Sequence, residues 1–305
     1  MEKLFKQLQE YKKDLEDKGY NVLYIGLYGS QNYNLADENS DIDARAIVLP
    51  TMTQIVKNKG ISLTENYPTG QVDVKDIFTF LEVLQKGNVA FIESVRTPVF
   101  IGNKKLREEL QIYKVKPMSI YGMMMEKIKA LEKGLPASSP FIEKIGYDPK
   151  QYHHIIRLRD VFTALLIRSD IATDVAYIKY RDSALERKNL MAIKRSGAGN
   201  LESVLDAAKS IAQNTFELAN IMAPFESQPI PQSTYDLIEE LMIENLFKPN
   251  KQFSARAERT FNQNIPSRDL KEFPILEQYK GKDISYVVYS YLEFLGESGE
   301  QNEDF

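Results

Sequence analysis

The sequence predicts an α/β domain with a small mixed sheet, followed by a mostly α-helical domain. Short apolar runs of strand length alternate with helix-like segments as far as residue 116. From Pro117 onward, long segments with helical periodicity dominate. The 305 residues fit two domains of about 150 residues each. We therefore expect domains at 1–116 and 117–305.

The first domain begins with a charged amphipathic helix that ends at Gly19, a residue suited to a left-handed terminus. Three apolar runs predict strands, at residues 22–28, 41–49 and 71–77. Two helices are expected after the third strand, at 78–87 and 88–97, the second of which Pro98 ends.

Helical periodicity describes most of the second domain. The expected helices cover residues 121–134, 150–169, 184–195, 201–222 and 233–247. The segment SGAGN at 196–200 is Gly-rich, but it lies between two helices, so we interpret it as a loop with Asn200 as an N-cap. One more helix is expected at 284–296, before an acidic end.

Composition excludes several chemistries. The sequence has no Cys, which excludes disulfides, thiol nucleophiles and thiolate metal sites. Its two histidines are the adjacent His153 and His154, too few for an HExxH site. Any metal must therefore be held by carboxylates, which favours a hard cation such as Mg²⁺.

The charge balance argues against a general nucleic-acid coating protein, because the net charge is −4 and the pI about 5.5. Residues 141–195 nevertheless contain eleven Lys and Arg against seven Asp and Glu, a local charge of +4. No apolar run reaches the roughly 18 residues of a membrane span, and the N-terminal segment lacks a signal-peptide core. We expect a cytoplasmic protein without membrane contact.

Two aspartates stand two positions apart in the segment SDIDARAIVL. Because strand side chains alternate between faces, Asp41, Asp43 and Arg45 are expected on one face of the strand 41–49. Neighbouring carboxylates repel each other unless a cation lies between them. The pair is therefore a candidate metal site, and a merely polar strand edge is the alternative.

A third carboxylate joins this pair if the strand 71–77 lies beside the strand 41–49. Asp73 is the candidate, while Asp76 competes with it but has the opposite strand parity. Three carboxylates can hold two Mg²⁺ ions. An exposed strand carboxylate is the other interpretation of Asp73.

Gly29 and Ser30 follow the first predicted strand and precede the aspartates by about ten residues. Glycine allows the backbone to approach a phosphate closely, and the serine hydroxyl and exposed amides can donate hydrogen bonds to it. The alternative is an ordinary β-turn.

A basic stripe is expected on the helix 150–169. Lys150, His154 and Arg157 are spaced at i, i+4 and i+7, which places them on one helical face close to His153. Such a face can bind phosphates or a nucleobase if it turns toward a cleft. A solvated helix face is the alternative.

The Gly-Ser turn followed by Asp-x-Asp resembles the pattern of the DNA polymerase beta-like nucleotidyltransferase superfamily. Residues 22–245 are more specifically similar to a family of predicted nucleotidyltransferases of bacteria and phages. The elements of that similarity are GSQNYNLADENSDID, KGNVAFIESV, YDPKQYHHIIRL and LMAIKRSGAGNLESVL.

The resemblance implies a polymerase beta-like nucleotidyltransferase domain at 1–116 and a helical substrate- or nucleotide-binding domain at 117–305. It implies transfer of a nucleoside monophosphate from an NTP, with ATP as the default donor, to an acceptor hydroxyl with two Mg²⁺ ions. The implied metal ligands and catalytic residues are Asp41, Asp43 and Asp73. The implied nucleotide-binding residues are Gly29, Ser30, Asn88, Glu93, Lys150, His154 and Arg157.

The acceptor stays open at this point. An RNA end such as that of tRNA, a protein side chain and a small molecule all fit, and the positive region favours RNA. A nucleotide- or RNA-binding module without turnover is the second hypothesis, against which the intact acidic residues argue. The sequence does not indicate the oligomeric state. Glu93 also has a plain interpretation, as a surface residue or a partner of Arg96.

Overall fold

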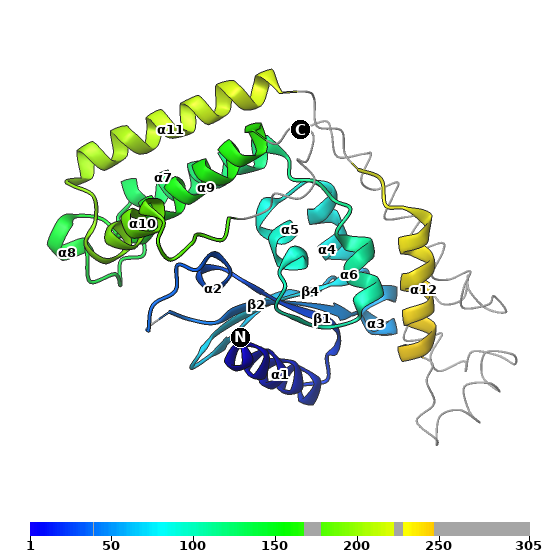
Figure 1. Ribbon diagram of the computed structural model, residues 1–305. Coiled ribbons are helices and arrows are strands. Elements are labelled where there is room, and N and C mark those ends of the chain that lie inside the picture. The colour runs from blue at the N-terminus through cyan, green and yellow to red at the C-terminus, as the bar shows by residue number, and fades with distance from the viewer. Residues whose placement is uncertain (39, 168–177, 223–227, 247–305) are drawn as a thin grey trace, which may run out of the picture.

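The computed structural model describes residues 1–38, 40–167, 178–222 and 228–246. These residues form a mixed five-stranded sheet followed by a group of helices (Figure 1), which confirms the predicted fold class. The helix predicted at 284–296 and the acidic end lie outside the described residues.

The described strands form one sheet in the order β3-β4-β2-β1-β5, in which β2 and β4 are parallel and the other neighbours antiparallel. Their bounds are β1 (Asn21–Tyr28), β2 (Asp43–Leu49), β3 (Ser62–Tyr67), β4 (Gly70–Asp76) and β5 (Phe100–Gly102). The parallel pairing places Arg45 opposite Asp73. Strand β2, which begins at Asp43, and strand β4, which carries the third candidate carboxylate, are therefore neighbours, as the site prediction required.

Helix α1 (Glu2–Asp17) covers one face of the sheet (Figure 1). Its buried residues Leu8, Tyr11 and Leu15 lie four or three positions apart and form one apolar stripe. They belong to a core that includes the alternate β2 residues Ala44 and Ala46. Because strand side chains alternate, Asp43 and Arg45 point to the other face.

That other face is covered by α4 (Ile77–Gln85), α5 (Val89–Arg96) and α6 (Lys104–Leu110) (Figure 1). Two short helices lie in the connections, α2 (Ser30–Tyr33) after β1 and α3 (Met52–Val56) after β2. The polar residues of β2 and β4 therefore lie between the sheet and the helical layer.

The helical part begins at Pro117, where the sequence predicts the change of character. Proline suits the first turn of a helix because its missing N–H has no partner there. The helices are α7 (Pro117–Glu132), α8 (Ile142–Ile145), α9 (Pro149–Ile167), α10 (Leu185–Ser196), α11 (Leu201–Ile221) and α12 (Gln232–Leu246). Helices α7, α9, α10 and α11 pack together, and α12 lies beside α6 (Figure 1). The loop at 197–200 and the Asn200 cap agree with the sequence.

Two details of the sheet differ from the prediction. Strand β2 begins at Asp43 rather than at residue 41, because the Ile42 backbone bonds outside the ladder, to Thr69 O at 2.8 Å and to the Tyr11 hydroxyl at 3.0 Å. Asp41 thus precedes the strand. The prediction also lacked the two edge strands, β3, which has alternating exposed and half-buried residues, and the three-residue β5.

Among the described residues, no helix combines the length and the apolar character needed to cross a membrane.

Candidate active site

The turn after β1 brings the chain next to the acidic pair. Gly29 has φ = 81°, a left-handed conformation that favours glycine, and a β-carbon built there would lie 3.5 Å from Asp43 Oδ2. Its amide donates to Glu93 Oε1 at 3.1 Å. The Gly29 amide is therefore already bonded within the protein, and the amide and hydroxyl of Ser30 are candidate phosphate donors at this turn.

Asp43 is partly buried at the start of β2, and Asp41 is exposed just before it. Burial raises the pKa of the Asp43 carboxyl, and the negative charge of Asp41 raises it further. Lys150 and Arg45 act in the opposite direction. A group that is both desolvated and next to a like charge gains from a bound cation, so the structure supports the physical argument made from the sequence.

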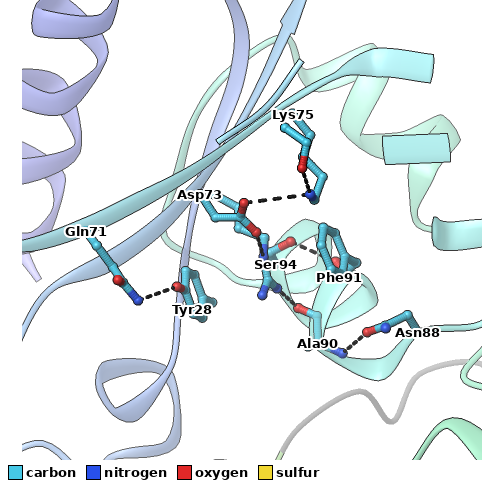
Figure 2. Close-up of polar contacts among 10 residues, drawn as sticks. Tyr28, Gln71, Asp73, Lys75, Asn88, Ala90, Phe91 and Ser94 are labelled. Atoms are coloured by element: carbon cyan, nitrogen blue, oxygen red, sulfur yellow. Dashed lines mark hydrogen bonds and ion pairs between the residues drawn. The ribbon is translucent and has the colours of Figure 1, made fainter. Parts of the chain in front are cut away.

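Asp73 lies on the same face of the sheet as Asp43, but on the neighbouring strand β4. Its Oδ2 accepts from Arg45 Nε at 3.0 Å. Lys75 Nζ lies 3.9 Å from its Oδ1, as Figure 2 shows. Arg45 is enclosed between the rings of Tyr28 and Phe91, with its guanidinium carbon 4.3 Å and 4.1 Å from the ring centres. The third carboxylate is thus held by a fixed cation.

Asp76 has a structural role. It is the N-cap of α4, where its Oδ1 accepts from the amides of Phe78 and Thr79, both at 3.0 Å. Its Oδ2 accepts from Ile61 N at 2.6 Å and from the Thr79 hydroxyl at 2.6 Å. Because the carboxylate is 2% exposed and has these four donors, Asp73 is the better placed of the two candidates.

Glu93 is buried, so its interpretation as a surface residue or a partner of Arg96 does not hold. The side chain is 3% exposed. Besides Gly29, it accepts from Asn32 Nδ2 at 3.2 Å and from the Tyr33 hydroxyl. Glu93 thus contacts the turn that follows β1 rather than the surface of the site.

Asn88 caps α5. Its Oδ1 accepts from the amide of Ala90 at 3.0 Å (Figure 2), which satisfies one of the free donors of the first turn. The capping contact alone accounts for an asparagine at this position, without any contact to a nucleotide.

The residues of the predicted basic stripe on α9 differ in how deeply they are buried. Lys150 is exposed and acts on Asp43, and His154 is half-buried. Arg157 is 5% exposed, and its guanidinium carbon lies 4.0 Å from the ring centre of Tyr33. Lys150 can therefore reach a ligand directly, whereas Arg157 contacts the α2 turn.

His153 is buried at 4% exposure, and burial, Arg157 and Lys194 together lower its pKa to about 3. Below pH 6.5 the unfolded chain takes up a proton on this residue that the folded chain does not, so the free energy of unfolding falls with falling pH. We expect about 1 kcal/mol of this loss between pH 6.5 and 5.5, and the His153→Gln variant should lack it. Urea unfolding across this range tests the prediction, and parallel curves for the two proteins would refute it.

Sequence reasoning missed the residues that hold the loop between the glycine turn and Asp41. Lys194 on α10 pairs with Asp37, with Nζ and Oδ2 3.2 Å apart, and donates to Ser40 Oγ at 2.9 Å. Arg187 Nε donates to Asn34 O at 2.7 Å. These cations belong to the predicted positive region, but their partners are more than 150 positions away and no local pattern indicates them.

The donor set fits magnesium in part. Mg²⁺ is commonly held by one or two carboxylates together with substrate phosphates and water, which Asp41 and Asp43 can supply. In the described parts of the chain, no three His, Asp or Glu side chains are gathered closely enough to form a metal site. Asp73 therefore contributes to such a site only if its pairing with Arg45 permits a further contact.

Comparison with known proteins identifies the class and then the family. The class is that of the polymerase beta-like nucleotidyltransferases, as the sequence suggested. Residues 2–217 match the family described as RNA repair pathway DNA polymerase beta family (RlaP), and the chain belongs to this family. In general terms it is therefore a nucleotidyltransferase.

One similar solved structure is a nucleotidyltransferase-like protein from Exiguobacterium sibiricum 255-15. It is 12% identical, the match covers 82% of this chain and 91% of that chain, and the TM-score is 0.25. A search among curated proteins found no match.

Proposed function

We propose that this protein transfers a nucleoside monophosphate from a ribonucleoside triphosphate to a hydroxyl of RNA, with Mg²⁺ and release of pyrophosphate. The observation that carries the proposal is the position of Asp43, whose carboxylate faces Gly29 at the turn after β1 while Asp41 lies beside it. A cation bound by these two carboxylates would lie next to backbone and hydroxyl donors for phosphate. Membership in the RlaP family supports the same reaction class.

Asp41 and Asp43 are the residues that would hold Mg²⁺. When bound, the metal would supply neutralisation of the triphosphate and of the leaving pyrophosphate. The Ser30 hydroxyl and amide would donate to phosphate oxygens, and the ammonium of Lys150 would contribute positive charge from the α9 side. Positioning and electrostatic stabilisation of this kind provide most of the catalysis in phosphoryl transfer.

Asp73 is assigned to the acceptor hydroxyl. The hydroxyl oxygen attacks the α-phosphorus, the bond from that phosphorus to the bridging oxygen breaks, and the proton leaves the hydroxyl. Arg45 holds Asp73 Oδ2 at 3.0 Å, so Oδ1 is the oxygen we propose for that proton or for a second metal ion. The Arg45 contact keeps the carboxylate aimed along the face that Asp43 shares.

An RNA acceptor is favoured by two observations. The family is described by an RNA repair pathway. The segment 141–195, which includes α9 and α10, has the local charge of +4. A polyanion would be attracted to this region despite the overall charge of −4.

The proposal is tested by measuring pyrophosphate release with Mg²⁺ and each of the four ribonucleoside triphosphates, ATP first, with and without total cellular RNA. Release that depends on RNA supports the proposal, and the active triphosphate identifies the base. Release that is independent of RNA would contradict the RNA acceptor and indicate a small molecule or protein instead. Nucleotide binding without any release would contradict turnover.

Lys150→Ala is expected to raise KM for the triphosphate by about tenfold with little change in melting temperature, because the side chain is exposed and acts on the site by charge. Lys188→Ala, which removes another exposed lysine of the positive region, is the matched control and should leave KM unchanged. Equal KM values for both variants would show that Lys150 belongs only to a solvated helix face.

A further inference from the structure

Glu93 accepts hydrogen bonds from three groups of one short turn. They are the Gly29 amide at 3.1 Å, Asn32 Nδ2 at 3.2 Å and the Tyr33 hydroxyl. One carboxylate of α5 therefore binds both ends of the segment that begins at Gly29 and contains Ser30. We propose that Glu93 is a positioning residue that fixes the Gly29–Tyr33 turn in the conformation that receives the triphosphate. This inference rests on the proposed function.

The burial of Glu93 separates this role from direct binding. At 3% exposure, the carboxylate cannot meet a triphosphate, whose negative charge would in any case repel it. Three donors directed at the carboxylate offset part of its desolvation, although burial still raises the pKa of Glu93. The side chain can act on the reaction through the turn that it holds.

The turn needs an external restraint. Gly29 has no β-carbon and has φ = 81°, so its backbone loses much conformational freedom when it is ordered. Its amide points to the buried Glu93 carboxylate and would lose this acceptor if Glu93 were removed. By accepting from this amide, Glu93 fixes the Tyr28–Gly29 peptide plane, one residue before Ser30, and so restrains the path of the chain into the serine donors.

Asn32 extends the restraint to the sheet. Its Nδ2 also donates to Leu27 O at 2.9 Å, and its Oδ1 accepts from the Thr97 hydroxyl at 2.8 Å. Asn32 is 5% exposed, so its amide group makes these bonds away from solvent. The turn is thus attached to β1 and to the end of α5 as well as to Glu93.

Arg157 connects the same turn to the helical part. Its guanidinium lies over the Tyr33 ring at 4.0 Å, and its positive charge acts on Glu93. Its buried Nε has no hydrogen-bond partner among the described residues, and the Tyr33 ring and the negative charge of Glu93 both contribute to stabilising the guanidinium there. The Tyr180 amide adds a bond to Tyr33 O at 3.0 Å. We assign Arg157 to this linkage rather than to nucleotide contact.

The experiment compares Glu93→Gln, Glu93→Ala and the core variant Leu106→Ala, which removes a buried side chain of α6 away from the turn. Glutamine keeps an acceptor for the Gly29 amide and, with its NH₂ group, a partner for the Tyr33 oxygen, whereas alanine keeps neither. Glu93→Ala should raise KM for the triphosphate by about tenfold and leave kcat within about threefold. Glu93→Gln should restore most of this loss, and Leu106→Ala should lower the melting temperature without changing KM.

A second readout does not depend on activity. Hydrogen exchange of the Gly29 amide should accelerate by about tenfold or more in Glu93→Ala and stay close to wild type in Glu93→Gln. Unchanged exchange at Gly29 in Glu93→Ala would overturn the inference, whatever the activity. Accelerated exchange in a protein that releases no pyrophosphate even as wild type would confirm the restraint and refute the proposed function instead.

Three further kinetic outcomes decide the role of Glu93 in the reaction. A KM that rises equally in Glu93→Ala and Leu106→Ala would show a general effect of stability and overturn the inference. A loss in kcat alone would also overturn it, because it would place Glu93 in the chemical step. A Tyr33→Phe variant, which removes one donor but keeps the ring for Arg157, should give a smaller rise in KM than Glu93→Ala, and a larger rise would shift the role to Tyr33.

Discussion

Asp43→Asn is expected to abolish pyrophosphate release and to leave the melting temperature unchanged or higher. The carboxylate is the proposed metal ligand that faces the glycine turn, so its loss removes the cation that balances the triphosphate. In the free protein, its charge is opposed by burial and by Asp41, and a neutral amide relieves both. Turnover assays and thermal unfolding of the same preparation check the two halves of the prediction.

Asp76→Ala is the matched control for Asp43→Asn. It removes an aspartate that caps α4, so it should lower the free energy of unfolding by about 1–2 kcal/mol and leave pyrophosphate release intact. Activity that survives in Asp43→Asn, or a melting temperature that collapses in it, would refute the assignment of Asp43 as a metal ligand.

The second large effect is expected from Arg45→Met, which should lower the free energy of unfolding by about 3 kcal/mol. The side chain is buried, pairs with Asp73 at 3.0 Å and lies between the rings of Tyr28 and Phe91. Its removal leaves the Asp73 carboxylate, whose side chain is 20% exposed, with a weaker cation, Lys75 at 3.9 Å. Urea unfolding measures the loss.

Lys18→Met provides the comparison for Arg45→Met. Lys18 also pairs with a carboxylate of a neighbouring element, Glu65 at 2.7 Å, and lies 5.3 Å from the centre of the Tyr67 ring, but its side chain is 42% exposed. An exposed pair of this kind contributes at most about 1 kcal/mol. Equal losses in the two variants would contradict a special role for the enclosed Arg45. The double variant Arg45→Met with Asp73→Asn, compared with the two single variants, then measures the coupling free energy between Arg45 and Asp73.

Much of the fold could be predicted because local signals agree with tertiary structure. The apolar run before Gly29, the stripe of α1 and the proline at the start of α7 each have one clear structural meaning. The edge strand β3 could not be predicted, since its SLTENY sequence buries little and its pairing with β4 is decided by tertiary contacts. Strand β2 begins two residues later than expected because the Ile42 backbone bonds to Thr69 and Tyr11 instead of to the ladder.

The candidate site could likewise be predicted only in part. Spacing was sufficient to place Asp43 and Asp73 on one face, because alternation along neighbouring strands is regular. Spacing alone did not predict that Arg45 pairs with Asp73, which depends on the register between β2 and β4. It also did not predict that Glu93 takes the Gly29 amide, which depends on how α5 packs over the sheet. Helical periodicity predicted a stripe on α9 but not its depth, which buries Arg157 and exposes Lys150.

The most direct test of nucleotidyl transfer follows two labels of the same triphosphate. ATP labelled at the α-phosphate and ATP labelled at the γ-phosphate are incubated separately with the protein, Mg²⁺ and RNA, beside Asp43→Asn and an EDTA control. Transfer of the α-label to RNA, with the γ-label released as pyrophosphate, is the predicted result, and both controls should abolish it. Transfer of the γ-label to RNA would contradict the proposal, because it would show a kinase reaction instead.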